Sequence, residues 1–386
     1  MRRRVCKGAC STTGSADSAA ATKVLAKLSV AGLGYSPKDK REVTSFGYDA
    51  TLTYLNGRNL LFTFDPHRLR ERGGGLQHES MRTVRALLID PGTQQVKRIV
   101  DWRVQGEGRY VWRAGGDRLV VHIGHELRLL DADLKTVRAA SLPGPLAWVS
   151  AAPAGGHFAV GVYTERHTPE VHRQLLDATG DDPEEDVDVR VYNGNLDLLL
   201  SSPRSSASYA PVLSDLGEIR VRAMGHGRWQ ISEYRWDRTD HKITVTKSSC
   251  RPHVSATLSD YLFVVGCESG SDVRWYRMLR PDGHPVLKAV SPSAETELAV
   301  NSSAPGEFAV RVVNLTKAMT PGQPFHKSDL ENEAVSVYAT ADGHRLFYAK
   351  AAEVPMAEQS FAVSPEGNQV ALIGDRSIDF YAVGSK

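Results

Sequence analysis

One pattern, two short strand-like runs around a polar turn, recurs along most of this chain. The copies begin at Arg85, Glu126, Val189, Ser232, Arg274 and Val335. Each run is rich in apolar, β-branched and aromatic residues, and each turn contains Asp or Asn, a composition typical of antiparallel β-hairpins. The turn residues Asp90, Asp131, Asn193, Asp237, Asp282 and Asp342 follow one another at intervals of 41, 62, 44, 45 and 60 residues. This recurrence indicates an all-β repeat protein.

A second pair of strand-like runs precedes each hairpin, so that every unit contains four strands. These pairs cover residues 50–64, 109–123, 146–163, 210–223, 253–266 and 297–313. Intervals of roughly 40–45 residues are typical of four-stranded propeller blades, and the two longer intervals indicate insertions of about 20 residues. Six complete units therefore precede the last one.

The last unit has only three strand-like runs, at residues 361–363, 370–373 and 378–381. An isolated run, KVLAKLSV at residues 23–30, lies near the other end of the chain. If this run pairs with the last unit, a ring of blades is closed and its open sheet edges disappear. We therefore expect seven blades, the seventh completed by the N-terminal strand.

The turn Ser364-Pro365-Glu366-Gly367 and the apolar strand at 369–372 resemble the signature of TolB-like and WD40-like repeats. With the repeat spacing, the chain is similar to the β-propeller superfamily over nearly its whole length. The resemblance implies an all-β fold, a seven-bladed β-propeller of four-stranded antiparallel blades. It identifies no functional family. The alternative, two packed β-sandwiches, leaves the spacing and the isolated N-terminal strand unexplained.

Composition narrows the classes of partner and the domain organisation. Residues 1–22 are rich in Ser and Ala and are expected to form a disordered leader, while residues 23–386 form one propeller domain. A net charge of +2, from 47 basic and 45 acidic residues, produces no strong positive electrostatic field that would attract nucleic acid. No apolar run reaches the roughly 18 residues of a membrane span. No signal peptide is visible, so the compartment is unknown, and export would require a misassigned start. We expect a monomer.

Three insertions, at residues 65–82, 164–186 and 314–333, fall between the second and third strands of blades one, three and six. In a propeller these connections emerge on the same face as the links between blades, whereas the other turns emerge on the opposite face. Long loops are uncommon without a role, so we expect a binding site on the face with the insertions. Drift of loops that tolerate insertion is the alternative.

The insertions contain the candidate binding residues, which are His67, Arg68, Arg70, His78, His167, His172, Phe325 and His326. In the first insertion, basic residues around three glycines are consistent with an anion site, although a flexible hinge is the simpler interpretation. In the second insertion, His167 and His172 could share a metal ion, but a solvated charged loop is the favoured interpretation. The aromatic residue of the third could anchor a partner or pack on its own blade. We expect no metal and no cofactor.

The cysteines form two pairs. Cys6 and Cys10 lie in the leader and are expected to be unstructured thiols. If residues 253–258 and 261–266 form a hairpin, Cys267 faces Pro252 and lies close to Cys250, so a disulfide is conceivable. Two separate buried thiols are the favoured alternative. A disulfide would indicate an oxidising compartment.

The sequence predicts architecture better than function. We favour a non-enzymatic module that binds a protein or peptide on the face with the insertions. The alternative is a propeller hydrolase or lyase with a metal or carboxylate site in the central funnel, and fold alone does not separate the two. His253, Glu295 and Glu358 lie near the starts of innermost strands but are too sparse to define a site. The six tryptophans are expected to lie in strands and pack between blades.

Overall fold

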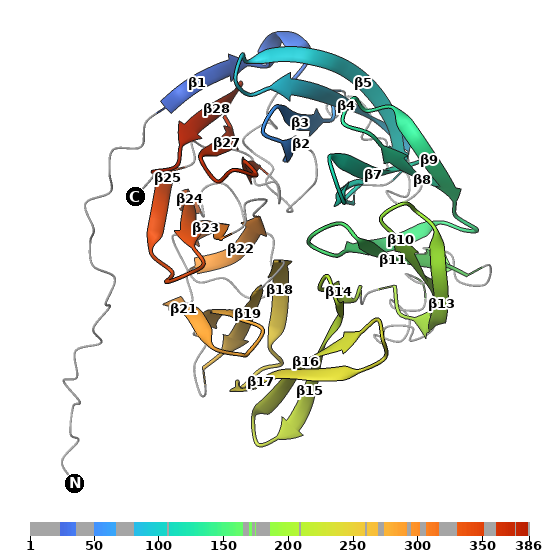
Figure 1. Ribbon diagram of the computed structural model, residues 1–386, viewed down its shortest axis with the longest axis vertical. Helices are drawn as coiled ribbons and strands as arrows, with labels where there is room; N and C mark the ends of the chain where they lie inside the picture. The colour runs from blue at the N-terminus through green and yellow to red at the C-terminus, as the bar shows by residue number, and fades with distance from the viewer. Residues whose placement is uncertain are drawn as a thin grey trace, which may run out of the picture.

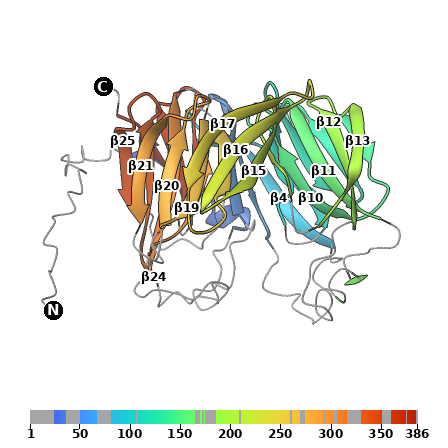
Figure 2. The ribbon, with the colours of Figure 1, turned by 90° about the horizontal axis from the view of Figure 1, so that it is seen from below.

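The strands form seven four-stranded antiparallel sheets around a central axis (Figure 1). The computed structural model describes residues 24–35, 50–66, 81–105, 108–164, 170–171, 174, 186–207, 210–258, 261–268, 274–291, 295–301, 306–315, 330–350, 360–374 and 376–384. The chain is a seven-bladed β-propeller, and the fold predicted from the repeat is confirmed. Seen from the side, the strands run between the two faces of the ring (Figure 2).

Each blade follows the chain order from its innermost to its outermost strand. Blade 1 contains β2 (Ala50–Asn56), β3 (Asn59–Phe64), β4 (Met81–Asp90) and β5 (Gln95–Gln105); blade 2 contains β6 (Val111–Ala114), β7 (Arg118–Ile123), β8 (Glu126–Leu130) and β9 (Thr136–Ser141). Blade 3 contains β10 (Leu146–Ala151), β11 (His157–Tyr163), β12 (Val187–Asn193) and β13 (Leu198–Ser205); blade 4 contains β14 (Val212–Leu213), β15 (Gly217–Gly225), β16 (Arg228–Arg235) and β17 (Asp240–Lys247). Blade 5 contains β18 (His253–Leu258), β19 (Tyr261–Cys267), β20 (Arg274–Leu279) and β21 (Pro285–Ser291); blade 6 contains β22 (Glu295–Asn301), β23 (Glu307–Leu315), β24 (Leu330–Ala339) and β25 (Arg345–Lys350). Blade 7 contains β26 (Phe361–Val363), β27 (Gln369–Ile373), β28 (Ser377–Ala382) and β1 (Val24–Ser29), which the short 3-10 helix η1 (Ala31–Leu33) follows.

The ring closes through β1, which is the outermost strand of blade 7 (Figure 1). It runs antiparallel to β28, with Leu28 opposite Ile378 and Ala26 opposite Phe380. Directly after β1, the backbone N–H of Val30 donates to the carbonyl of Arg376 at 2.9 Å. The predicted pairing of the N-terminal strand with the last unit is therefore confirmed.

The hydrophobic core is divided into seven layers, each between two neighbouring blades. The layer between blades 7 and 1, for example, joins Val30, Leu60, Phe62 and Phe380, all with no exposed surface. The middle strands carry apolar residues on both faces because each face packs against another sheet. This packing explains why their sequences are continuously apolar rather than alternating.

Local turn chemistry explains the regular spacing of the repeat. The side chains of all six turn residues accept backbone N–H groups within the turn that joins the third and fourth strands of blades 1 to 6. In blade 2, Asp131 Oδ1 accepts from the N–H of both Asp133 and Lys135, at 2.9 and 2.8 Å. Asp and Asn form such turns from local sequence alone. The predicted leader, residues 1–22, lies outside the described residues.

Candidate functional site

The three insertions join the second strand of a blade to its third, as predicted. They connect β3 to β4, β11 to β12 and β23 to β24. Because strands alternate in direction, these connections open on the face that also receives the links between blades; we call it the insertion face. The eight candidate binding residues, His67, Arg68, Arg70, His78, His167, His172, Phe325 and His326, lie outside the described residues and stay predictions.

On the opposite face, short turns of neighbouring blades hydrogen-bond to one another. Between blades 1 and 2, Asn56 Nδ2 donates to Asp117 Oδ2 at 2.8 Å. Between blades 3 and 4, the N–H of Ala154 donates to Asp215 Oδ1 at 2.7 Å. These contacts join the turns of the opposite face to one another across neighbouring blades.

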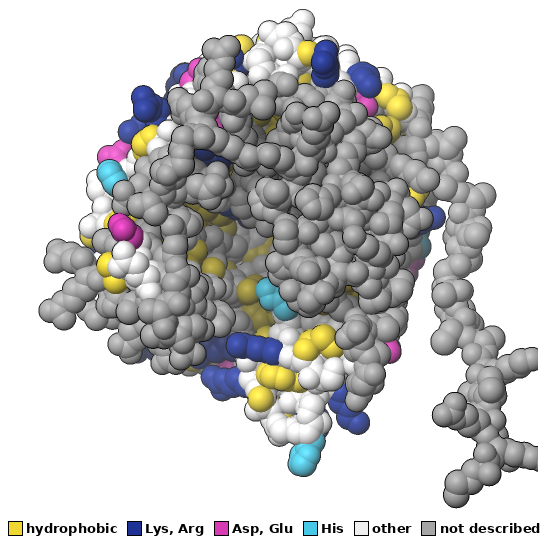
Figure 3. All heavy atoms as spheres, turned by 180° about the vertical axis from the view of Figure 1, so that it is seen from behind, with side chains coloured by type: hydrophobic (Ala, Val, Ile, Leu, Met, Phe, Trp, Pro, Cys, Tyr) yellow, Lys and Arg dark blue, Asp and Glu magenta, His cyan; other side chains and the backbone are white. Residues whose placement is uncertain are grey.

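Figure 3 views the insertion face, which is hollowed at its centre and carries Lys and Arg side chains over blade 4. Arg228, Lys247 and Arg251 are exposed there. Arg228 and Lys247 stand directly opposite each other on β16 and β17. Like charges at such positions repel, and the described residues provide none of the three cations with a salt bridge. We call these three residues the basic corner; none of them was among the site residues predicted from the sequence. The sequence pattern that could have identified the cluster is the group of basic residues around the Gly-His-Gly turn.

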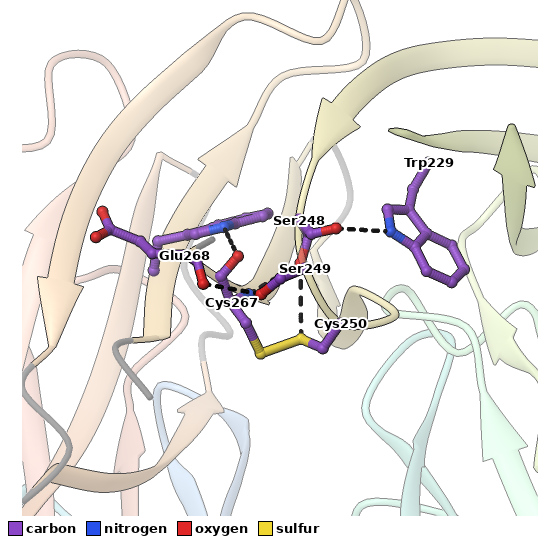
Figure 4. Close-up of a disulfide and its surroundings, with 7 residues drawn as sticks. Trp229, Ser248, Ser249, Cys250, Cys267 and Glu268 are labelled. Atoms are coloured by element: carbon purple, nitrogen blue, oxygen red, sulfur yellow. Dashed lines mark hydrogen bonds between the residues drawn. A yellow bond between two sulfur atoms is a disulfide. The ribbon is translucent and has the colours of Figure 1, made fainter. Parts of the chain in front are cut away.

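A disulfide lies next to Arg251 of the basic corner in the sequence. Figure 4 shows the disulfide and its surroundings. The disulfide joins Cys250, in the link between blades 4 and 5, to Cys267 at the end of β19, with a Cα–Cα distance of 5.5 Å. The alternative that we favoured from the sequence, two separate thiols, is wrong. Cys267 also does not face Pro252, because a β-bulge between Val254 and Ala256 shifts the register of the hairpin by one residue.

Ser248 connects the disulfide to the tip of the β15–β16 hairpin (Figure 4). Its Oγ accepts the N–H of Cys267 at 2.9 Å and lies 3.6 Å from Cys250 Sγ. Its own N–H donates to the carbonyl of Gly227 at 2.9 Å, and its carbonyl accepts Nε1 of Trp229 at 3.1 Å. The disulfide and the hairpin tip are therefore held by one hydrogen-bonded residue.

The tryptophans were predicted to lie in strands and to pack between blades, and two of them differ from this prediction. Trp236 lies in the turn after β16 rather than in a strand, and its ring stacks on His157 of blade 3 at 4.8 Å between centroids. Trp229 is partly exposed and bonds within its own blade. Trp275 packs on Gly266, where an added Cβ would lie 2.1 Å from the ring.

A cluster of three hydroxyl groups and one histidine are buried between blades, toward the insertion face. Thr63 Oγ1 lies 2.7 Å from Thr51 Oγ1 and 2.6 Å from the hydroxyl of Tyr110, whose pKa is raised by burial. His122 is 3% exposed, and its Nε2 has no hydrogen-bond partner among the described residues. Burial, aided by the nearby His125, lowers the pKa of His122 to about 4. Both groups are uncharged at neutral pH.

Substitution of His122 by Gln is expected to reduce the dependence of stability on acid. His122 is neutral in the folded protein and protonates near pH 6.5 when unfolded, so its contribution is present above pH 6.5 and is lost as the pH falls toward 4. The loss amounts to roughly 3 kcal/mol. Urea unfolding at several pH values measures it. The exposed His241→Gln variant is the control, and equal pH dependence in all three proteins would contradict the assignment.

No family model matches the chain, and no curated protein matches it by sequence. The chain is similar to several solved structures at low sequence identity. The WD40 domain of Neurospora crassa Pan2 is 11% identical, covers 88% of this chain and 90% of that one, and has a TM-score of 0.45. The oligogalacturonate lyase of Vibrio parahaemolyticus is 12% identical, with coverages of 94% and 98% and a TM-score of 0.47. Neither similarity assigns a function or a site residue here.

Among the residues that the structure describes, no group of three or more His, Cys, Asp or Glu side chains is arranged to hold a metal ion. No helix in the described ranges is long and apolar enough to cross a membrane. His253 and Glu295 begin β18 and β22, whereas Glu358 lies outside the described residues. Partial desolvation and the nearby Arg251 keep the pKa of His253 below its usual value.

Proposed function

We propose that this propeller is a non-enzymatic module that binds a protein or peptide on the insertion face. The observation that carries the proposal is that all three long insertions join second strands to third strands and so open on one face. Independent drift of surface loops need not favour one face. The basic corner adds positive charge to the same face, with no carboxylate partner among the described residues, and charge complementarity is a usual component of protein recognition.

The rigidity of the ring supports the same function. Seven apolar layers fix the blades relative to one another, and short turns on the opposite face are hydrogen-bonded between blades. Loops held on such a scaffold lose less conformational entropy on binding than loops on a mobile one. The ring thus acts as a platform on which the insertions contact a ligand.

A selection from a random 12-residue peptide library displayed on phage tests the proposal. We expect a family of related peptides to bind the full chain. Replacing residues 67–80, 165–185 and 316–329, which lie within the three insertions, with short Gly-Ser turns, singly and together, is expected to weaken binding of those peptides by at least about tenfold, or about 1.4 kcal/mol. Isothermal titration calorimetry measures the affinities.

The control is the charge swap Asp133→Lys with Lys135→Glu on the opposite face, where both side chains are exposed. It is expected to leave the affinities unchanged. Selected peptides that bind the loop-replaced proteins as tightly as the full chain would contradict the proposal. More than about half an equivalent of a dialysis-resistant metal would favour the alternative, a hydrolase or lyase in the central funnel.

A further inference from the structure

Blade 4 differs from the other blades in its innermost strand. This strand, β14, has two residues, whereas the innermost strands of the other blades have three to seven. It pairs only with Glu218 and Ile219 of the nine-residue strand β15. Among the described residues, the inner edge of β15 therefore has no strand partner from residue 220 to residue 225.

The unpaired edge presents backbone groups in a known order. The carbonyl of Gly217 accepts the N–H of Ser214, so the backbone of Gly217 points to the inner edge. The β15–β16 register is continuous from Gly217 to Ala223, and alternate residues of a strand point their N–H and C=O groups to the same edge. Val221 and Ala223 therefore point toward the unpaired edge, while their neighbours bond to β16.

The hairpin that carries this edge is exposed and well anchored. Every residue from 222 to 228 is exposed, and Met224 keeps 48% of its surface. The hairpin projects from the rim of the ring (Figure 1). Its tip is fixed by the hydrogen bonds of Ser248 to Gly227 and Trp229. An edge that is already ordered is suited to accept another strand at low entropic cost.

The charge on the sheet that carries this edge indicates the class of partner. Arg222, Arg228 and Lys247 share one face of the hairpin sheet by the strand register. Arg222 lies 3.4 Å from Asp240, but the described residues offer Arg228 and Lys247 no carboxylate. Charged side chains on an edge strand are a common protection against aggregation. Arg222 lies on β15 itself, whereas Arg228 and Lys247 lie one and two strands away from it on the side opposite the open edge, so they attract an anionic segment along β15 at long range.

We propose that the inner edge of β15 binds an extended acidic segment of a partner protein, which adds to blade 4 as an antiparallel or parallel strand. The inference rests on the proposed binding function and names its ligand class. Backbone hydrogen bonds to Val221 and Ala223 hold the segment in register. The basic corner selects carboxylate side chains.

Three synthetic 10-residue peptides test the proposal by fluorescence anisotropy. The first alternates Glu with Val or Thr, the second has Lys in place of Glu, and the third keeps Glu but is N-methylated at every second backbone nitrogen. The first is expected to bind the full chain at least about tenfold more tightly than the other two. Its binding is expected to weaken between about 50 mM and about 300 mM salt.

Matched variants separate strand addition from charge. Ala223→Pro removes an N–H that faces the unpaired edge without removing a bond to β16, and Ala223→Val keeps it. The first is expected to weaken binding of the Glu peptide about tenfold and the second less than about twofold. Arg228→Gln with Lys247→Gln is expected to weaken it about tenfold, and the exposed Arg103→Gln with Lys135→Gln is the control of equal charge change.

Equal affinity of the Ala223→Pro and Ala223→Val variants would overturn strand addition, and the loop-replacement experiment would still decide the binding function separately. Equally tight binding of a single-stranded oligonucleotide would indicate a nucleic-acid surface instead. The chain's own acidic run at residues 181–185 is a competing occupant. If only a chain with that run neutralised binds the Glu peptide, an intramolecular segment occupies the edge and the proposal is wrong.

Discussion

A chain that begins at residue 31, without β1, is expected to unfold at a midpoint temperature about 10 °C or more below that of the full chain. The deletion removes the outer strand of blade 7, where five residues of β1 are in register with β28. It also removes Val30, which is fully buried. Lost hydrogen bonds at about 1 kcal/mol each, with the exposed apolar surface, cost on the order of 5 kcal/mol or more. Calorimetry and circular dichroism measure the midpoint.

A deletion of residues 1–22 is the matched control, because it keeps β1 and removes only the predicted leader. It is expected to change the midpoint by less than about 2 °C. The longer deletion leaves the edge of β28 open, and we expect that protein to associate at high concentration on size-exclusion chromatography. A peptide of residues 22–35 added in excess is expected to restore part of the stability. An unchanged midpoint in the longer deletion would refute closure by β1.

The sequence predicted the architecture because its signals are local. The six Asp and Asn turn residues hydrogen-bond within their own turns, so their spacing reports the blades directly. The pairing of β1 with β28 could be predicted because the last unit has only three strands of its own and needs a fourth to complete the blade. The continuous apolar runs of the middle strands reflect packing on two faces.

The site could be predicted only in part, because its features depend on register and on strand length. The bulge between Val254 and Ala256 moves every later pairing by one residue, and no sequence pattern marked it. The shortness of β14 depends on how the chain crosses from blade 3 to the centre of blade 4. The opposition of Arg228 and Lys247 exists only once β16 and β17 are paired.

Loss of the disulfide between Cys250 and Cys267 is expected to lower the stability of the protein strongly. The double variant Cys250→Ser/Cys267→Ser is expected to have a free energy of unfolding about 3 kcal/mol lower than the full chain, because the bond closes a loop with a sequence separation of 17. Adding a reductant to the unmodified chain is expected to produce the same loss. Urea unfolding followed by circular dichroism measures it. The control Cys6→Ser/Cys10→Ser changes two leader cysteines and is expected to leave the unfolding free energy unchanged.

The same double variant is expected to loosen the tip of the β15–β16 hairpin, because Ser248 joins it to the disulfide. Cys267 donates its N–H to Ser248, and Ser248 in turn bonds to Gly227 and Trp229. Hydrogen exchange should therefore rise at residues 225–229 more than in β2 or β3, which lie across the ring. A uniform rise in exchange would mean that the disulfide stabilises the ring as a whole and does not order the hairpin. If reduction left both stability and exchange unchanged, the two cysteines would not be bonded in the protein.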